Sequence, residues 1–267
     1  MKENLGKYYD KSSGFQEAQF QKLIKLMRDN VDCDRVRYLL DIGAGTGIRT
    51  EQLLDVCLGL ERITAIEPDP EILSVATTEH MSDRIEYHPI AAHDLDTFDE
   101  SERCFDVVFS NWALHWVLDK DKLMEDVNRL TPPDARFVFS SCEKLPHLLM
   151  DIDEYVRSEL LLPKSRAYPW EYFDVEGWTQ FLNKHGWAVK AQKTHLVYRT
   201  VDDAKTYLDD WFAASTSKFL YGQQMEQLTD LSLSDLVWLM QKKYPHPELE
   251  EGLFFAEDTM FIVAEKI

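Results

Sequence analysis

Five short apolar runs, separated by amphipathic segments, organise the first 141 residues. Residues 38–42 and 62–66 are such runs, and between them the apolar positions over 48–54 recur at helical spacing. Short runs without polar alternation indicate strands that are buried on both faces. Three further strands and one further helix are predicted at 85–90, 105–110, 136–141 and 119–130, respectively. Strands that alternate with helices in this way predict a doubly wound parallel α/β sheet.

After residue 145, short strands and helices no longer alternate regularly. We predict a helix over 175–185, ended by Gly186, and a long strand over 187–200. Helices follow over 201–211 and 232–244, the second with Ser232 or Ser234 as N-cap, before a final strand over 254–267. No repeat, low-complexity tract or linker separates these segments. The chain is therefore expected to form a single domain, 1–267, with helical cap insertions at about 145–173 and 201–250.

The loop after the first predicted strand carries glycine at every second position, Gly43, Gly45 and Gly47. Glycine tolerates positive φ and lets a ligand approach the backbone closely. A dinucleotide fingerprint of the G-x-G-x-x-G type would have glycine at position 48, where this chain has Ile48. With Asp41 preceding it, the pattern favours S-adenosylmethionine over NAD as the cofactor. An ordinary strand-to-helix turn is the alternative interpretation of the glycines alone.

A second acidic residue supports the cofactor interpretation. Glu67 ends the second predicted strand, 24 positions after Gly43. In a βαβ unit, an acid at this place, roughly 20 residues beyond the glycines, accepts hydrogen bonds from the hydroxyls of a ribose. Glu67 is therefore predicted to bind the ribose of the cofactor.

Three segments together resemble class I S-adenosylmethionine-dependent methyltransferases: 41–47, Glu67 and the pair Asp94–Leu95. The resemblance implies a seven-stranded, Rossmann-like sheet whose last strand, 254–267, is antiparallel. It also implies that Asp94 and Leu95 contact the adenine, one through its carboxylate and the other through its backbone amide. We include Asn111, at the end of the fourth strand, among the cofactor-binding residues.

A narrower resemblance concerns the two edges of the expected site. Residues 8–16 and 110–116 are similar to segments of juvenile hormone acid, trans-aconitate and malonyl-carrier-protein methyltransferases, which esterify carboxylates. The resemblance implies that Gln16 and Trp116 contact the substrate. The predicted function is methyl transfer from S-adenosylmethionine to a small-molecule acceptor, with a carboxylate as the first choice.

His115 separates the alternatives for the acceptor. A carboxylate is ionised at neutral pH and needs no general base, whereas a hydroxyl or an amine more often does, and His115 is the candidate base. Packing beside Trp116 is the other interpretation of His115, and we favour it. Aminopropyl transfer on the same fold and a catalytically silent cofactor-binding regulator are the remaining alternatives.

The composition of the chain limits the kinds of molecule that it is expected to bind. A formal charge of −19 and a pI of about 4.8 oppose nucleic-acid binding, which needs a basic surface. The N-terminal residues contain no apolar secretory core, and no run approaches the roughly 18 apolar residues of a membrane span. We expect a cytoplasmic enzyme with a small-molecule acid or hydroxyl substrate, without nucleic-acid or membrane partners. The oligomeric state is left open, and a monomer is compatible with the sequence.

The four cysteines give no signal of a metal or redox centre in their spacing. Cys33, Cys57, Cys104 and Cys142 lie far apart in the chain, without a C-x-x-C pair. They are interpreted as buried or idle thiols, and no metal is expected.

Overall fold

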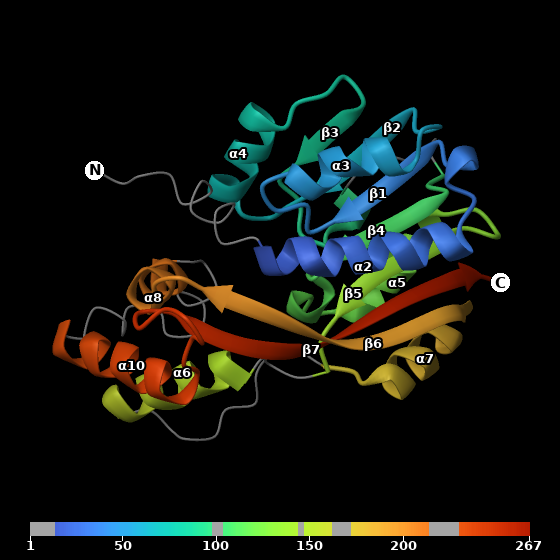
Figure 1. Ribbon diagram of the computed structural model, residues 1–267. Helices are drawn as coiled ribbons and strands as arrows, with labels where there is room; N and C mark the ends of the chain where they lie inside the picture. The colour runs from blue at the N-terminus through green and yellow to red at the C-terminus, as the bar shows by residue number, and fades with distance from the viewer. Residues whose placement is uncertain (1–13, 98–103, 144–146, 162–171, 214–229) are drawn as a thin grey trace. The chain divides into compact units, whose positions relative to one another are not determined.

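The computed structural model describes residues 14–97, 104–143, 147–161, 172–213 and 230–267. It contains one seven-stranded sheet with the strand order β3-β2-β1-β4-β5-β7-β6 (Figure 1). The strands are β1 Tyr38–Ile42, β2 Arg62–Ile66, β3 Ile85–His88, β4 Val107–Asn111, β5 Arg136–Ser141, β6 Trp187–Val201 and β7 Leu253–Lys266. The pairs among β1 to β5 are parallel, and β7 is antiparallel to β5. The predicted doubly wound sheet with a reversed last strand is confirmed.

Helices connect most of these strands. They are α2 Gly14–Asn30, α3 Ile48–Val56, α4 Pro70–Glu79, α5 Lys120–Leu130, α6 His147–Glu159, α7 Val175–Lys184, α8 Ala204–Ala213 and α10 Asp230–Lys243, with short 3-10 turns η1 Cys33–Arg35, η2 Leu95–Thr97 and η3 Leu114–Trp116. The predicted helix over 201–211 begins later, at Ala204, because β6 continues to Val201. The N-cap prediction for α10 was wrong, since the helix already begins at Asp230 and contains both Ser232 and Ser234.

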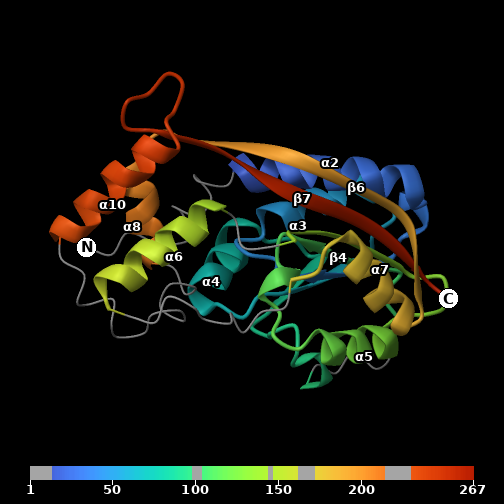
Figure 2. The ribbon, with the colours of Figure 1, turned by 90° about the horizontal axis from the view of Figure 1, so that it is seen from below.

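The order of the strands reverses between β1 and β4. The chain passes through α3 and α4 on its way outward to β2 and β3, and through α5 on its way from β4 to β5. Because such crossovers are right-handed, α3 and α5 must cover opposite faces of the sheet. Figure 2 shows α2 and α3 on one side, with α5 and α7 on the other. Ligands of doubly wound sheets bind at the carboxyl ends of the strands where the order reverses.

Acidic residues begin three of the helices. The Asp69 carboxylate accepts hydrogen bonds from the Glu71 and Ile72 amides at 2.9 and 3.2 Å. Asp119 and Asp174 accept in the same way at the starts of α5 and α7. Each carboxylate satisfies helix donors that would otherwise lack a partner, and its charge suits the positive end of the helix dipole. The capping residue of α3 is Gly47, which has no side chain to cap with.

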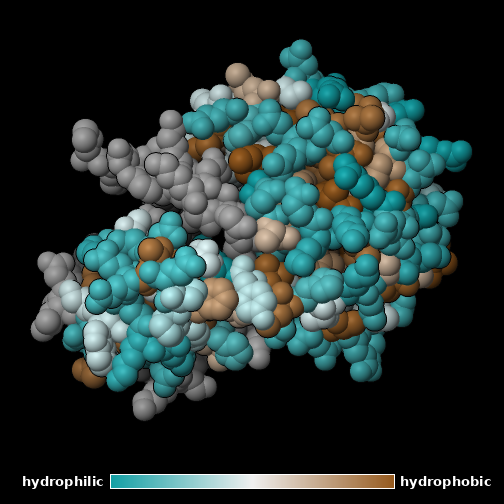
Figure 3. Space-filling model, viewed as in Figure 1, coloured by the Kyte–Doolittle hydropathy of each residue, from teal (hydrophilic) through white to brown (hydrophobic). Residues whose placement is uncertain are grey.

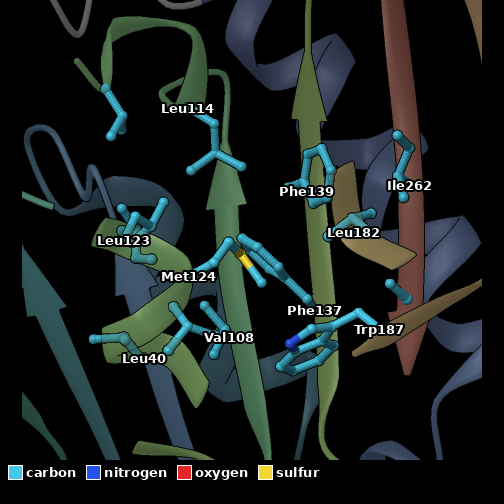
Figure 4. Close-up of a cluster of buried hydrophobic side chains, with 14 of the residues drawn as sticks. Leu40, Val108, Leu114, Leu123, Met124, Phe137, Phe139, Leu182, Trp187 and Ile262 are labelled. Atoms are coloured by element: carbon cyan, nitrogen blue, oxygen red, sulfur yellow. The ribbon is translucent and has the colours of Figure 1, made fainter. Parts of the chain in front are cut away.

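A continuous apolar cluster fills the space between the sheet and the helices α5 and α7 (Figure 4). Phe137 of β5 lies at its centre, with the Phe139 and Trp187 rings at centroid distances of 4.9 and 5.9 Å. The indole N–H of Trp187 donates to the Asn128 side chain at 2.8 Å, so burial of this ring leaves no polar atom without a partner.

Helix α2 packs on the opposite face through one aromatic and one polar contact. The Phe20 ring lies edge-on to Phe109 of β4, with centroids 6.0 Å apart. The buried Gln19 amide donates to the Thr259 hydroxyl of β7 at 3.0 Å. These contacts fix α2, whose first turn contains Gln16, against the middle of the sheet.

The chain divides into two compact units. The larger contains 16–144, 169–195 and 259–267, and the smaller takes most of its described residues from 147–161, 196–213 and 230–258. Within the smaller unit, the Arg199 guanidinium lies 4.8 Å from the Tyr207 ring centroid and 5.8 Å from that of Phe255. Much of the two predicted cap insertions falls in the smaller unit. Its role as a cap stays a prediction.

The surface of the larger unit is mainly hydrophilic on the side seen in Figure 3, with scattered hydrophobic side chains. None of the helices in the described ranges combines the length and the apolar character needed to cross a membrane.

Replacing Phe137 by Ala tests the core. The fully buried ring leaves a cavity, so the free energy of unfolding should fall by about 3–5 kcal/mol. Leu58→Ala is the control, because Leu58 is 73% exposed and its loss should change stability by less than about 0.5 kcal/mol. Urea unfolding of both variants measures the difference. Equal midpoints would contradict the assignment of Phe137 to the core.

Candidate functional site

The loop after β1 has left-handed backbone at each of its three glycines. The φ angles of Gly43, Gly45 and Gly47 are 77°, 58° and 85°. A Cβ on Gly43 would lie 2.3 Å from the Cβ of Ala113, which follows β4, and one on Gly47 would lie 2.5 Å from the Tyr87 hydroxyl. Backbone conformation therefore requires glycine at all three positions, and lack of space also requires it at Gly43 and Gly47.

Glu67 holds this loop from the end of β2. Its carboxylate accepts a hydrogen bond from the Gly45 amide at 3.1 Å and another from the Asp69 amide at 3.0 Å. Loss of hydration raises the pKa of Glu67, and the two amides oppose the shift. Each carboxylate oxygen can accept more than one hydrogen bond, so acceptor capacity remains for ribose hydroxyls.

Asp41 has a structural partner. Its buried carboxylate accepts a 2.6 Å hydrogen bond from the Thr50 hydroxyl of α3. Burial raises the pKa of Asp41 to about 7, and the nearby Glu67 charge adds to the shift. Asp41 thus links β1 to the first turn of α3, behind the glycine loop. A contact between Asp41 and the cofactor stays a prediction.

The predicted adenine pair follows β3. Asp94 is exposed at the turn that precedes η2, with its amide donating to the Ala91 carbonyl at 3.0 Å. Leu95 is fully buried, and its carbonyl accepts from the Arg129 guanidinium at 3.1 Å. The topology brings this pair to the same edge of the sheet as the glycine loop and Glu67.

A strained turn ends β4. Trp112 has a φ of 59°, which side chains rarely adopt. The Ser140 hydroxyl of β5 accepts from the Trp112 amide at 2.9 Å and donates to the Asn111 side chain at 3.0 Å. Ser140 therefore holds the turn in place. Sequence reasoning missed Ser140, although its position opposite Asn111 in the parallel pair of β4 and β5 could have identified it.

This turn buries His115 among aromatic rings. Ring centroids of Trp116, Trp112 and Tyr172 lie 4.8, 5.0 and 6.4 Å from that of His115, which is 2% exposed. Burial lowers the pKa of His115 to about 3, and the Lys120 charge contributes. His115 is neutral at physiological pH. Its Nδ1 is buried and has no hydrogen-bond partner among the described residues.

Two further residues, Trp116 and Gln16, are predicted to contact the substrate. Trp116 is partly buried in η3, with its amide donating to the Ala113 carbonyl at 2.9 Å. Gln16 lies in the first turn of α2, but its side chain is outside the described part of the structure. Tyr172, which stacks near His115, carried no signal in the sequence. Among the described residues, no cluster of three or more His, Cys, Asp or Glu could hold a metal ion.

The arrangement suits an adenosine-containing cofactor. The glycine loop is held by hydrogen bonds from the Gly43, Ala44 and Gly45 amides to β2 and Glu67, and the N-terminus of α3 behind it has no side-chain cap. The Glu67 carboxylate stands beside this loop, with the β4 turn on its other side, where Ala113 meets Gly43. A nucleoside with a ribose near Glu67 fits this donor and acceptor set.

Comparisons with known proteins agree with the prediction of a methyltransferase. Residues 40–139 match the family described as a methyltransferase domain. The chain is 26% identical over 178 residues to the uncharacterized methyltransferase C70.08c of Schizosaccharomyces pombe, covering 63% of this chain and 66% of that protein. It is 31% identical over 133 residues to the malonyl-[acyl-carrier protein] O-methyltransferase of Chlorobium phaeovibrioides, covering 50% and 51%. The match thus spans between half and two thirds of these relatives.

A solved structure shows the same fold. Phosphoethanolamine N-methyltransferase 2 of Haemonchus contortus, in complex with S-adenosylhomocysteine, aligns with a TM-score of 0.53 at 19% identity, over 92% of this chain and 52% of that one. The match to a methyltransferase domain confirms the prediction of S-adenosylmethionine as the cofactor class, and the solved structure confirms the fold. The individual residues predicted to contact cofactor or substrate stay predictions.

His115→Phe tests the buried imidazole. The folded-state pKa of His115, about 3, lies below the ordinary 6.5, so only the unfolded chain takes up this proton as the pH falls through 6.5. The contribution of His115 to stability should therefore rise by about 2 kcal/mol from pH 5 to pH 7 and be absent in the variant. Urea unfolding across this range measures it. His147→Phe, at an exposed histidine, is the control. Parallel pH curves for wild type and His115→Phe would show that His115 is not buried neutral.

Proposed function

We propose that this chain, which carries a methyltransferase domain over residues 40–139, transfers the methyl group of S-adenosylmethionine to a small-molecule carboxylate and forms a methyl ester. The observation that carries the choice of acceptor is the buried, neutral His115 at the end of β4. An acceptor that needs a proton removed would find a poor base there.

The residues proposed to bind the cofactor orient it and take no part in bond making. Bound S-adenosylmethionine supplies an electrophilic methyl group on a positively charged sulfur. The backbone of the Gly43–Gly47 loop would lie along this ligand, while Glu67 would accept from the ribose hydroxyls and Asp94 from the adenine. Asp41 keeps α3 in register with β1 through Thr50. Asn111, held by Ser140, completes the edge of the site.

The acceptor region excludes water and aligns the nucleophile. A carboxylate with a pKa near 4 is ionised at pH 7, so the reaction requires no proton transfer to the protein. Correct alignment alone can lower the barrier by about 7–11 kcal/mol in favourable cases. The aromatic rings of Trp112, Trp116 and Tyr172 around His115 provide an apolar wall for this alignment. Gln16, on α2, is proposed to hold the carboxylate from the other edge.

His115 itself is proposed as a positioning group. A neutral imidazole carries one N–H, and a buried Nδ1 without a partner among the described residues costs free energy unless a ligand meets it. A substrate carboxylate oxygen near Nδ1 would satisfy this atom. The name of the Chlorobium relative, an O-methyltransferase of a malonyl group, supports a carboxylate acceptor.

The net charge of the protein supports a particular class of substrate. A formal charge of −19 supports a small-molecule acid or hydroxyl substrate over nucleic acid, because an acidic surface repels phosphates. A cytoplasmic location and a monomer are part of the proposal. Hydroxyl or amine methylation with His115 as base, and aminopropyl transfer, are the alternatives that the two experiments below separate.

Cofactor binding is tested by thermal unfolding and calorimetry. S-adenosylhomocysteine, but not NAD, should raise the Tm, because a ligand that binds only the folded state stabilises it. Glu67→Ala should weaken S-adenosylhomocysteine binding by about 5- to 150-fold, the equivalent of 1–3 kcal/mol for hydrogen bonds to a charged group. Glu71→Ala, in the exposed first turn of α4, is the matched control. Stabilisation by NAD alone would overturn the cofactor assignment.

The acceptor is tested with methyl-labelled S-adenosylmethionine and a panel of acids, phenols, amines and polyamines, with the product identified by mass. The expected product is a methyl ester, formed with a pH–rate profile that has no imidazole limb between pH 5.5 and 9. Gln16→Ala and Trp116→Ala should reduce kcat/KM on the order of 100-fold, and His115→Ala less. A methylated hydroxyl or amine as product, together with nearly complete loss of activity in His115→Ala, would instead establish a hydroxyl or amine acceptor. An unlabelled acceptor that gains the mass of the propyl chain, with the label retained in 5′-methylthioadenosine, would establish aminopropyl transfer.

A further inference from the structure

Two loops of the larger unit meet at the end of α3 that is opposite the glycine loop. One is η1, Cys33–Arg35, before β1, and the other is 57–59, between α3 and β2. The Arg37 guanidinium donates to the Asp34 carbonyl at 3.1 Å and to the Gly59 carbonyl at 2.7 Å, so it bridges the two backbones. A Cβ on Gly59 would lie 2.4 Å from the Asp34 carbonyl oxygen. The two loops are therefore in direct contact.

This contact brings together two cysteines that are 24 positions apart. The thiols of Cys33 and Cys57 lie close enough for each to shift the pKa of the other. Cys33 is partly exposed, whereas Cys57 is fully buried. Both residues lie outside helix interiors: Cys33 begins η1, and Cys57 follows α3 with a φ of −115° and a ψ of 88°. Their backbones can adjust by small rotations without breaking a long helix.

The surroundings distinguish the two sulfurs. The interaction with Cys57 and the Arg28 charge lower the pKa of Cys33, while burial and the carboxylates of Asp32 and Asp34 oppose the shift. The interaction with Cys33 and burial raise the pKa of Cys57. Because the thiolate is the reactive form, Cys33 is the accessible nucleophile and Cys57 its protonated neighbour.

We propose that Cys33 and Cys57 are a redox-active pair that forms a reversible intramolecular disulfide when a peroxide reaches Cys33. The spacing of the cysteines in the sequence gave no sign of such a pair, because the two thiols meet only after β1 and β2 pair in the sheet. The proposal does not depend on the proposed function.

The reaction balances in two steps. The Cys33 thiolate attacks one oxygen of hydrogen peroxide, the O–O bond breaks, and the leaving hydroxide takes a proton to become water, so that Cys33 carries a sulfenic acid. The Cys57 sulfur then attacks the Cys33 sulfur, the S–O bond breaks, and the Cys57 proton leaves with the hydroxide as a second water. Two thiols are oxidised and one peroxide is reduced to two waters. A dithiol reductant reverses the change.

The cross-link would join the end of α2 to the end of α3. It closes the chain between residues 33 and 57, which restricts the unfolded state and so stabilises the fold. The cofactor loop lies at the opposite end of the nine-residue helix α3, about 14 Å away at 1.5 Å per residue. Oxidation should therefore raise the Tm without changing the affinity for S-adenosylhomocysteine.

Peptide mapping of the full-length protein tests this. After treatment with hydrogen peroxide and alkylation, trypsin should release residues 29–35 joined to 50–62, and the number of thiols titrated in the denatured protein should fall from four to two. The Tm should rise on the order of 5–10 °C and return to its starting value after reduction. Cys57→Ser should instead stop at the sulfenic acid of Cys33, which dimedone traps.

Cys104→Ser is the matched control, because Cys104 is exposed and outside the pair. This variant should still form the 29–35 to 50–62 cross-link, whereas Cys33→Ser should not. Oxidation of Cys33 to a sulfenic or higher acid without the cross-link would overturn the proposal. The same holds if Cys33 pairs with Cys104 of a second molecule, or if all four thiols survive peroxide unchanged.

Discussion

The left-handed loop after β1 is the constraint on which the rest of the site depends. Amides of Gly43 and Ala44 both donate to the Ile66 carbonyl, at 2.9 and 3.0 Å, which ties the loop to β2. Gly43 also touches Ala113 after β4 so closely that no Cβ fits. The loop is thus shared by the strands on both sides of the point where the order reverses. A side chain at Gly43 would separate β1 from the β4 turn and disturb the cofactor and acceptor regions together.

Two acids behind this loop have a structural and an electrostatic role. Asp41 links β1 to α3 through Thr50, and Glu67 links β2 to the Gly45 amide. Burial raises the pKa of each, because an ionised carboxylate is costly where hydration is poor. A cationic ligand in the same region offsets that cost, because opposite charges favour the ionised carboxylates. A sulfonium cofactor meets this requirement, whereas the phosphates of a dinucleotide would add to it.

The turn at the end of β4 has a strained backbone that positions His115. The positive φ of Trp112 persists because Ser140 bonds both its amide and the Asn111 side chain. This turn directs His115 inward among aromatic rings, where the imidazole loses its usual basicity. An imidazole in such surroundings can donate a hydrogen bond but accepts a proton poorly at neutral pH. The geometry therefore favours a nucleophile that arrives already ionised.

The sequence alone determined the sheet, the cofactor class and the residues of the loop. Those features depend on local rules: apolar runs of strand length, glycine where φ is positive, and acids at strand ends. It did not determine where α10 begins, the buried state of His115, the part played by Ser140 or the contact of Cys33 with Cys57. The buried state of His115 depends on tertiary packing, and Ser140 and Cys57 meet partners that are 29 and 24 positions away in the chain, which no local pattern encodes. The pKa of His115 falls because tertiary packing removes its water. The loops that carry the two thiols meet once the strands have paired, and Arg37 joins the Asp34 and Gly59 carbonyls there.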